Sequence, residues 1–76
     1  MLKIETITAF VASDEEGEGL IGEKLGNAWI PYVCADEERI QSILPRIKEM
    51  QRTHPDKEIK IIQFSVRTDV TEKYLK

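Results

Sequence analysis

Ile7-Thr8-Ala9-Phe10-Val11-Ala12 is the stretch of sequence that sets the architecture of this chain. It is almost continuously apolar and rich in β-branched residues. Such a run is typical of a strand that is covered on both faces, as the central strands of a sheet are. We therefore predict a strand over residues 3–12 at the centre of a sheet.

Two further strands are expected to flank this one. Residues 28–35 contain Trp29, Ile30, Tyr32 and Val33 and form the second predicted strand. Pro31 lies inside it and cannot donate a ladder hydrogen bond, so this strand belongs at a sheet edge or carries a bulge. Residues 58–68 alternate in polarity and form the third predicted strand.

A helix is predicted over residues 36–53. Asp36 is a favourable N-cap, and Glu37 and Glu38 in the first turn complement the helix dipole. Pro45 projects almost opposite the apolar stripe, so one kinked helix is the preferred interpretation and two short helices are the alternative. The stripe at helical spacing consists of Ile40, Ile43, Leu44, Ile47, Met50 and Gln51.

These elements give an α+β fold with the order β-β-α-β in a single domain spanning residues 1–76. Residues 13–27 are acidic and hold all four glycines, so we expect a long mobile loop, with a short helical turn around Leu20–Leu25. The tail, residues 69–76, is expected to be a last helical turn or a loose extension. A hairpin followed by a helical crossover makes every neighbouring strand pair antiparallel. The predicted three-stranded sheet has the spatial order 2-1-3, with one helix packed on one face.

One helix covers only one face of such a sheet. The opposite face would present apolar residues of the first strand together with Ile61, and exposed apolar patches of a few hundred Å² mark contact surfaces. A chain of 76 residues with one cysteine also has a small core and no internal disulfide. We therefore expect the chain to self-associate, as a homodimer.

Charge is spread unevenly along the chain. Residues 1–38 carry nine acids and two lysines, whereas residues 39–76 carry nine bases and five acids, and the net charge is −3. The acidic block repels phosphates and attracts basic surfaces. We therefore expect a basic protein partner, and no nucleic-acid partner, for Asp14, Glu15, Glu16 and Glu18.

Trp29 and Tyr32 are the aromatic residues of the predicted edge strand. Aromatic side chains at an exposed edge are favoured anchors for a protein partner. The candidate partner-binding residues are therefore Asp14, Glu15, Glu16, Glu18, Trp29 and Tyr32.

No catalytic constellation is evident in the sequence. The segment Gly17-Glu18-Gly19-Leu20-Ile21-Gly22 matches the letters of the dinucleotide fingerprint, but it lies among acids that would repel a pyrophosphate. Cys34 and His54 lie at opposite ends of the predicted helix, too far apart for a nucleophile and its base. We expect no enzymatic activity, no cofactor and no metal site.

The sequence thus predicts a small non-enzymatic protein–protein interaction or regulatory module. Two alternatives remain open: an acidic inhibitor or mimic that occupies a nucleic-acid-binding protein, and a small-ligand-binding domain. The chain has no run of about 20 apolar residues that would suit a membrane helix. A lone cysteine fits a reducing compartment, so a cytoplasmic location is expected.

Overall fold

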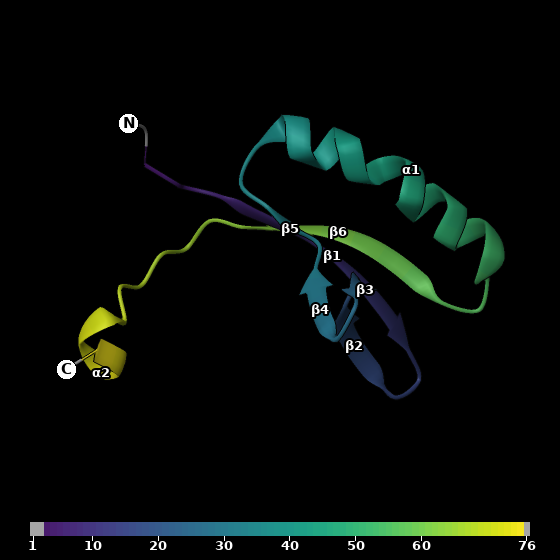
Figure 1. Ribbon diagram of the computed structural model, residues 1–76. Coiled ribbons are helices and arrows are strands. Elements are labelled where there is room, and N and C mark those ends of the chain that lie inside the picture. Colours follow the sequence, from purple (N-terminus) through teal and green to yellow (C-terminus); the bar gives the residue numbers. More distant parts are fainter. Residues whose placement is uncertain (1–2, 76) are drawn as a thin grey trace.

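A four-stranded antiparallel sheet with one long helix on one face forms the body of the protein (Figure 1). The computed structural model describes residues 3–75. The central strand is β1 (Ile7–Asp14), and β6 (Glu58–Phe64) pairs along one side of it. On its other side β1 pairs with β2 (Gly17–Leu20) and with β5 (Val33–Cys34). The predicted α+β class and the antiparallel sheet are confirmed. The sheet has four strands instead of three, and it departs from the predicted order 2-1-3 because β2 and β5 both pair with the same side of β1.

A tight turn at Glu15–Glu16 leads directly from β1 into β2. The Asp14 carboxylate accepts a 2.8 Å hydrogen bond from the Glu16 N–H, as in an Asx turn. Gly17 has a φ of 142°, which favours glycine at this position. The expectation of a loop over residues 13–27 was therefore wrong, because turn chemistry lets these acidic residues pair as strands.

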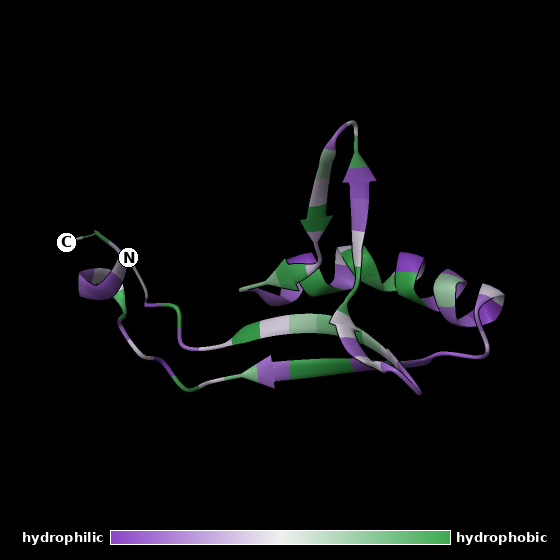
Figure 2. Cartoon of the chain, turned by 90° about the horizontal axis from the view of Figure 1, so that it is seen from below, coloured by the Kyte–Doolittle hydropathy of each residue, from purple (hydrophilic) through white to green (hydrophobic). Residues whose placement is uncertain are grey.

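A second hairpin leaves the sheet as a separate two-stranded element, which we call the arm (residues 22–31). It consists of β3 (Gly22–Leu25) and β4 (Ala28–Pro31), joined by a turn at Gly26–Asn27 in which Gly26 has a φ of 61°. Figure 2 shows the arm standing crosswise to β1 and β6. The expected helical turn at Leu20–Leu25 was wrong, since these residues are extended.

Three backbone hydrogen bonds fix the point where the arm leaves the sheet. The Ile21 N–H donates to the Phe10 carbonyl at 2.8 Å, and the Phe10 N–H donates to the Tyr32 carbonyl at 3.3 Å. The Tyr32 N–H closes the set by donating to the Ile21 carbonyl at 2.8 Å. The predicted strand 28–35 is consequently interrupted at Tyr32, and Pro31 ends β4.

The long helix α1 (Glu37–Thr53) lies close to its predicted bounds. The Asp36 carboxylate caps its first turn by accepting a 2.8 Å hydrogen bond from the Arg39 N–H. Pro45 is exposed inside one continuous helix, so the single-helix interpretation is confirmed. The core between α1 and the sheet consists of Phe10, Ile21, Tyr32, Cys34, Ile43 and Ile47.

The chain beyond β6 extends away from the body. β6 ends at Phe64, earlier than the predicted strand 58–68, and residues 65–70 continue without regular structure. A short helix, α2 (Thr71–Leu75), follows and lies well apart from α1 (Figure 1). A helical turn is thus present over residues 71–75, while Lys76 lies outside the described residues. None of the helices in the described part of the chain has the length and apolar character needed to cross a membrane.

Candidate interaction site

The face of the sheet that is turned away from α1 is the first candidate, and we call it the open face. Register partners in neighbouring antiparallel strands lie on the same face. Ala9 pairs with Val33 on one side and with Ile62 on the other, so these three residues share a face. Ile7, the buried Val11 and Lys60, which pairs with Val11, lie on this face as well. Its other large apolar side chains are Leu20, Val33, Ile62 and Phe64.

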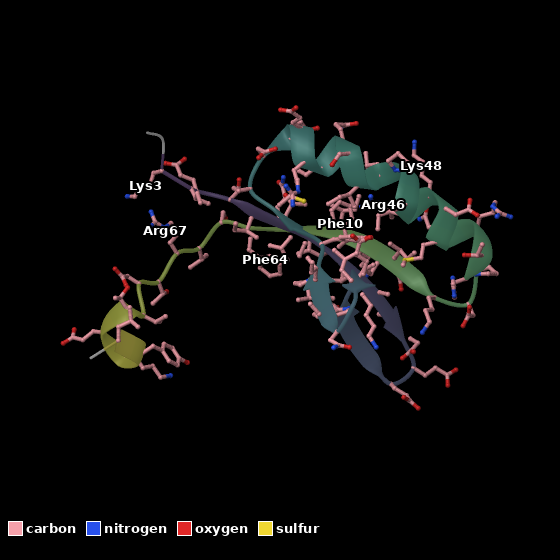
Figure 3. The ribbon with its side chains drawn as sticks, viewed as in Figure 1. Lys3, Phe10, Arg46, Lys48, Phe64 and Arg67 are labelled. Carbon is pink, nitrogen blue, oxygen red and sulfur yellow. The ribbon has the colours of Figure 1, made fainter. Side chains whose placement is uncertain are left out.

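These side chains are accessible to solvent. Phe64 is 56 % exposed, Leu20 46 % and Val33 41 %, although Ala9 beneath them is only 3 % exposed. Figure 3 shows Phe10 between the sheet and α1, with Phe64 on the other side of the ribbon. The open face is therefore an apolar surface for which the described residues provide no complete cover.

Ile61 does not belong to this face. It pairs with Phe10, whose side chain lies in the core beneath α1, so Ile61 is on the helix side of the sheet. It is nevertheless 48 % exposed, because the helix residues pack mainly around Phe10, Tyr32 and Cys34 and leave β6 partly uncovered. The sequence-based assignment of Ile61 to the far face was wrong.

Trp29 is an exposed aromatic side chain of the arm. It pairs with Lys24 and so lies on the face of the arm opposite Glu23, which contacts Tyr32 and Arg46. A Cβ built on Gly22 would lie 2.9 Å from Cε2 of Trp29, so the indole covers the Gly22 backbone. The ring remains 55 % exposed. Trp29, a predicted partner-binding residue, is thus an accessible aromatic side chain on the arm.

Tyr32, the other predicted aromatic anchor, is placed differently. It is 8 % exposed, and its hydroxyl donates a 2.9 Å hydrogen bond to Oε2 of Glu23 in the arm. The same oxygen lies 3.7 Å from a guanidinium nitrogen of Arg46 in α1. Burial raises the pKa of Tyr32, and the Glu23 carboxylate adds to this effect. Tyr32 therefore fastens the arm to the body and does not share a surface with Trp29.

The predicted acidic residues gather at the end of β1, and we call Asp14, Glu15, Glu16 and Glu18 the acidic turn. Lys57 lies 3.4 Å from Oδ2 of Asp14. The pKa of Asp14 is lowered first by the hydrogen bond from the Glu16 amide and then by Lys57. The acidic turn keeps a strong negative charge on a surface tip.

Two acids from a distant part of the sequence join the acidic turn. Asp56 and Glu58 line the same shallow hollow as Asp14, Glu15 and Glu16. They arrive there because β6 pairs with β1, with Glu58 opposite Ser13. Sequence reasoning missed them, since no local signal connects residues about 40 positions apart.

A pocket of about 260 Å³ lies between the arm and α1. Glu23 enters it from the arm, and Arg39 and Arg46 enter it from the helix. Small-molecule sites are mostly lined by apolar and aromatic side chains around a few polar groups. The rest of the lining is mainly apolar or aromatic and comes from Ile30, Pro31, Tyr32, Val33 and Ile43. The alternative of a small-ligand-binding domain stays a prediction.

The glycines of the fingerprint-like segment and Cys34 lie in separate strands of the described chain. Gly17 and Gly19 lie in β2 and Gly22 in β3, with no helix N-terminus following them. Cys34 is buried, and burial raises the pKa of its thiol, which disfavours the reactive thiolate. Among residues 3–75, no group of three or more His, Cys, Asp or Glu side chains is arranged to hold a metal ion.

Comparison with known proteins finds no matching family model, no matching curated protein and no matching solved structure. Three surface features of this chain could bind a partner. The open face offers apolar contact area, Trp29 offers an exposed aromatic side chain, and the acidic turn offers charge.

Proposed function

We propose that this chain is a small, non-enzymatic protein–protein interaction module that self-associates through its open face. The observation that supports the proposal is the accessible apolar surface formed by Leu20, Val33 and Phe64 on the side of the sheet away from α1. Completing the burial of side chains that are already half-buried contributes roughly 1 kcal/mol each. A two-fold dimer would use the same patch on both copies and so gain this energy twice.

Trp29 is the residue that we expect to anchor the association. Large aromatic side chains dominate the binding energy of many interfaces when they become fully desolvated. Trp29 is the only tryptophan of the chain, and it is half-exposed on the arm. Its fluorescence therefore reports whether the arm takes part in the association.

The acidic turn is the part that we expect to bind a basic partner. Its carboxylates, with Asp56 and Glu58 nearby, form a continuous acidic tip at one end of the sheet. Such a tip attracts basic surfaces over about 10 Å at 0.1 M salt. The cytoplasmic location inferred from the single cysteine stays a prediction.

Self-association is tested by sedimentation equilibrium over a wide range of protein concentration. Phe64→Lys places a charge on the open face and should shift the chain to monomer. Leu25→Lys is a matched control, because Leu25 is 55 % exposed and Phe64 56 %, yet Leu25 lies on the helix side of the arm. The control should associate like the wild type. A wild-type chain that remains monomeric at all concentrations would overturn the proposal.

The acidic turn is tested with a lysine- and arginine-rich probe peptide. Binding should weaken steeply with salt, since exposed charges are screened. The triple variant Glu15→Gln, Glu16→Gln, Glu18→Gln should bind the peptide several-fold more weakly. Glu37→Gln with Glu38→Gln, in the first turn of α1, is the control for general loss of charge. An equal loss of peptide affinity in both variants would argue against a specific role of the acidic turn.

A further inference from the structure

The pocket between the arm and α1, which we call the arm pocket, is lined by two separate parts of the sequence. From the arm come Glu23 and Ile30, which are register partners and so lie on the same face of the hairpin. The lining residues of α1 are three or four positions apart and share one side of the helix: Arg39, Ser42, Ile43 and Arg46. The arm pocket therefore depends on the position of the arm beside α1.

The lining of the arm pocket has one positive charge in excess. Arg39 and Arg46 contribute two guanidinium groups, and Glu23 contributes one carboxylate. Oε2 of Glu23 is already engaged, because it accepts the 2.9 Å hydrogen bond from Tyr32 and lies 3.7 Å from a guanidinium nitrogen of Arg46. The Arg39 guanidinium, by contrast, forms no ion pair with an acid among residues 3–75. Arg39 is therefore the cation that is free to bind an anionic ligand.

Apolar side chains lie beside these charges. Ile30 and Pro31 line the arm pocket from the arm, and Ile43 lines it from the helix. Ile43 belongs to the core, whereas Ile30 is 42 % exposed. A volume of about 260 Å³ has room for about nine water molecules, so it suits a small ligand. Apolar walls around a few polar groups are typical of small-molecule sites.

A single carboxylate is the anionic group that fits this lining best. Guanidinium groups bind carboxylates through two parallel N–H···O hydrogen bonds, and one negative charge balances the excess positive charge. Ser42 adds no donor, because its hydroxyl already donates a 2.7 Å hydrogen bond to the Arg39 carbonyl. A phosphate dianion would bring a second negative charge close to Glu23, and the repulsion between them disfavours it.

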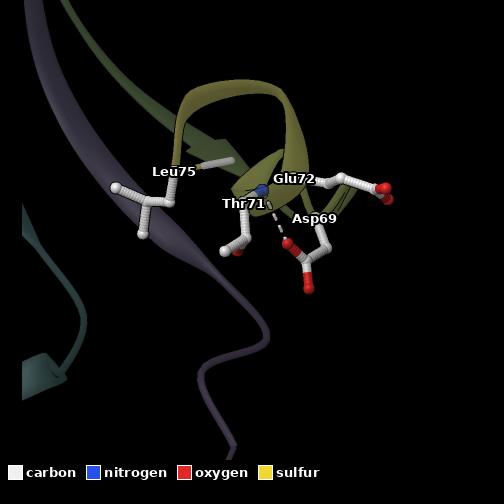
Figure 4. A pocket seen from close by; sticks show the side chains of 4 residues that line it. All are labelled: Asp69, Thr71, Glu72 and Leu75. Carbon is white, nitrogen blue, oxygen red and sulfur yellow. Dashed lines mark hydrogen bonds between the residues drawn. The ribbon is translucent and has the colours of Figure 1, made fainter.

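The larger hollow at the C-terminal tail is built differently. Its lining residues, Asp69, Thr71, Glu72 and Leu75, all belong to one short segment, so no second element fixes its shape (Figure 4). Asp69 and Glu72 give it two carboxylates, and the Asp69 carboxylate accepts a 2.9 Å hydrogen bond from the Thr71 N–H. The arm pocket is therefore the better candidate for a ligand site.

We propose that the arm pocket binds a small monocarboxylate with an apolar body. The carboxylate binds Arg39, with Arg46 as a second cation, and the apolar body packs on Ile30, Pro31 and Ile43. The inference goes beyond the proposed self-association and does not depend on it. The arm pocket is on the helix side of the sheet, whereas self-association uses the open face.

Benzoate is a suitable probe, because it joins one carboxylate to a small apolar ring. In an NMR titration, the backbone amides of Tyr32, Val33 and residues 39–46 should shift saturably, with a dissociation constant on the order of 1 mM. Benzyl alcohol has a ring without the charge, and acetate has the charge without a ring, so each should bind several-fold more weakly. No saturable shift up to about 10 mM benzoate would overturn the proposal. Equal binding of either analogue would also contradict it.

The variant Arg39→Gln tests the anchoring cation. It should weaken benzoate binding several-fold, because the guanidinium without an ion pair is lost. Lys48→Gln is the matched control, since it removes one positive charge from the opposite side of α1, nine positions along the helix. The control should bind benzoate like the wild type. Equal weakening of the two folded variants, checked by circular dichroism, would mean that benzoate responds only to net charge.

The variant Glu23→Gln tests the charge argument from the other side. It removes the carboxylate of the lining, while the new amide oxygen still accepts the hydrogen bond from Tyr32. Benzoate should therefore bind more tightly than to the wild type, and weaker binding by the folded variant would contradict the role given to charge. A monomeric chain that binds benzoate would contradict the proposed function alone. A self-associating chain that does not bind benzoate would contradict this inference alone.

Discussion

The hydroxyl of Tyr32 donates a 2.9 Å hydrogen bond to Glu23, and this contact ties the arm to the core. Tyr32 is buried against the core residues under α1, while Glu23 lies near the base of β3. Arg46 of α1 lies 3.7 Å from the same carboxylate oxygen. Because an isolated two-stranded hairpin is marginally stable in water, these contacts at its base are what hold the arm in place.

Alkaline titration should reveal the burial of Tyr32. Its pKa is raised in the folded state, so folding favours the neutral phenol. The stabilisation is fully present below the unfolded pKa, which is about 10, and is lost as the pH rises through the higher folded pKa. In ultraviolet titration, the Tyr32 phenol should ionise above the ordinary range of a tyrosine pKa.

The variant Tyr32→Phe should remove this pH dependence of stability. At neutral pH it should cost about 1 kcal/mol, because the hydrogen bond to Glu23 is lost. Urea unfolding of Tyr32→Phe and of the control Tyr74→Phe measures both effects. Identical alkaline unfolding of the wild type and Tyr32→Phe would contradict the assignment.

Gly22→Ala should destabilise the arm strongly. A Cβ at this position would lie 2.4 Å from the Ile30 carbonyl oxygen and 2.8 Å from Cα of Pro31, and backbone atoms cannot move aside cheaply. We expect a loss of about 1 to 3 kcal/mol in the free energy of unfolding. Gly19→Ala is the matched control, because its Cβ would meet no atom within 4 Å. Equal stability of the two variants in thermal unfolding would sink this explanation.

Pro45→Ala should stabilise the protein. Proline in a helix interior lacks the N–H that would bond to the carbonyl of Gln41, and its ring crowds that turn. Since Pro45 is exposed, alanine would restore the hydrogen bond without disturbing the core. The expected gain is about 1 to 3 kcal/mol, measured by urea unfolding. Lys48→Ala, also exposed on α1, should change stability by less than about 0.5 kcal/mol.

Replacing isoleucine with valine should lower the free energy of unfolding more in the core beneath α1 than at the partly exposed edge of β6. Ile47 is 3 % exposed in the core, so Ile47→Val should lose about 0.5 to 1.5 kcal/mol. Ile61 is on the same side of the sheet but 48 % exposed, and Ile61→Val should cost clearly less. Comparable losses in denaturant unfolding would mean that α1 covers β6 more fully than the structure indicates.

Local patterns predicted several parts of this fold correctly. The apolar run around Phe10 indicated a central strand, and β1 is central. The apolar stripe and the Asp36 cap predicted α1 nearly to its ends. The arm was missed, although Gly26-Asn27 is a recognised two-residue hairpin signal, because the acidic glycine-rich composition was interpreted as a loop. The four acids of the acidic turn were predicted as a group, and the structure keeps them together.

The sequence of this chain carries its strand and helix propensities, its helix caps and its uneven charge, because these depend on neighbours within a few residues. Long-range pairing determined the rest. The register of β6 against β1 places Ile61 on the helix side of the sheet and Phe64 on the open face. A shift of one residue would turn each side chain to the opposite face. The same pairing brings Asp56 and Glu58 to the acidic turn. The backbone hydrogen bonds among Phe10, Ile21 and Tyr32 bury Tyr32, which the sequence alone would leave at a sheet edge.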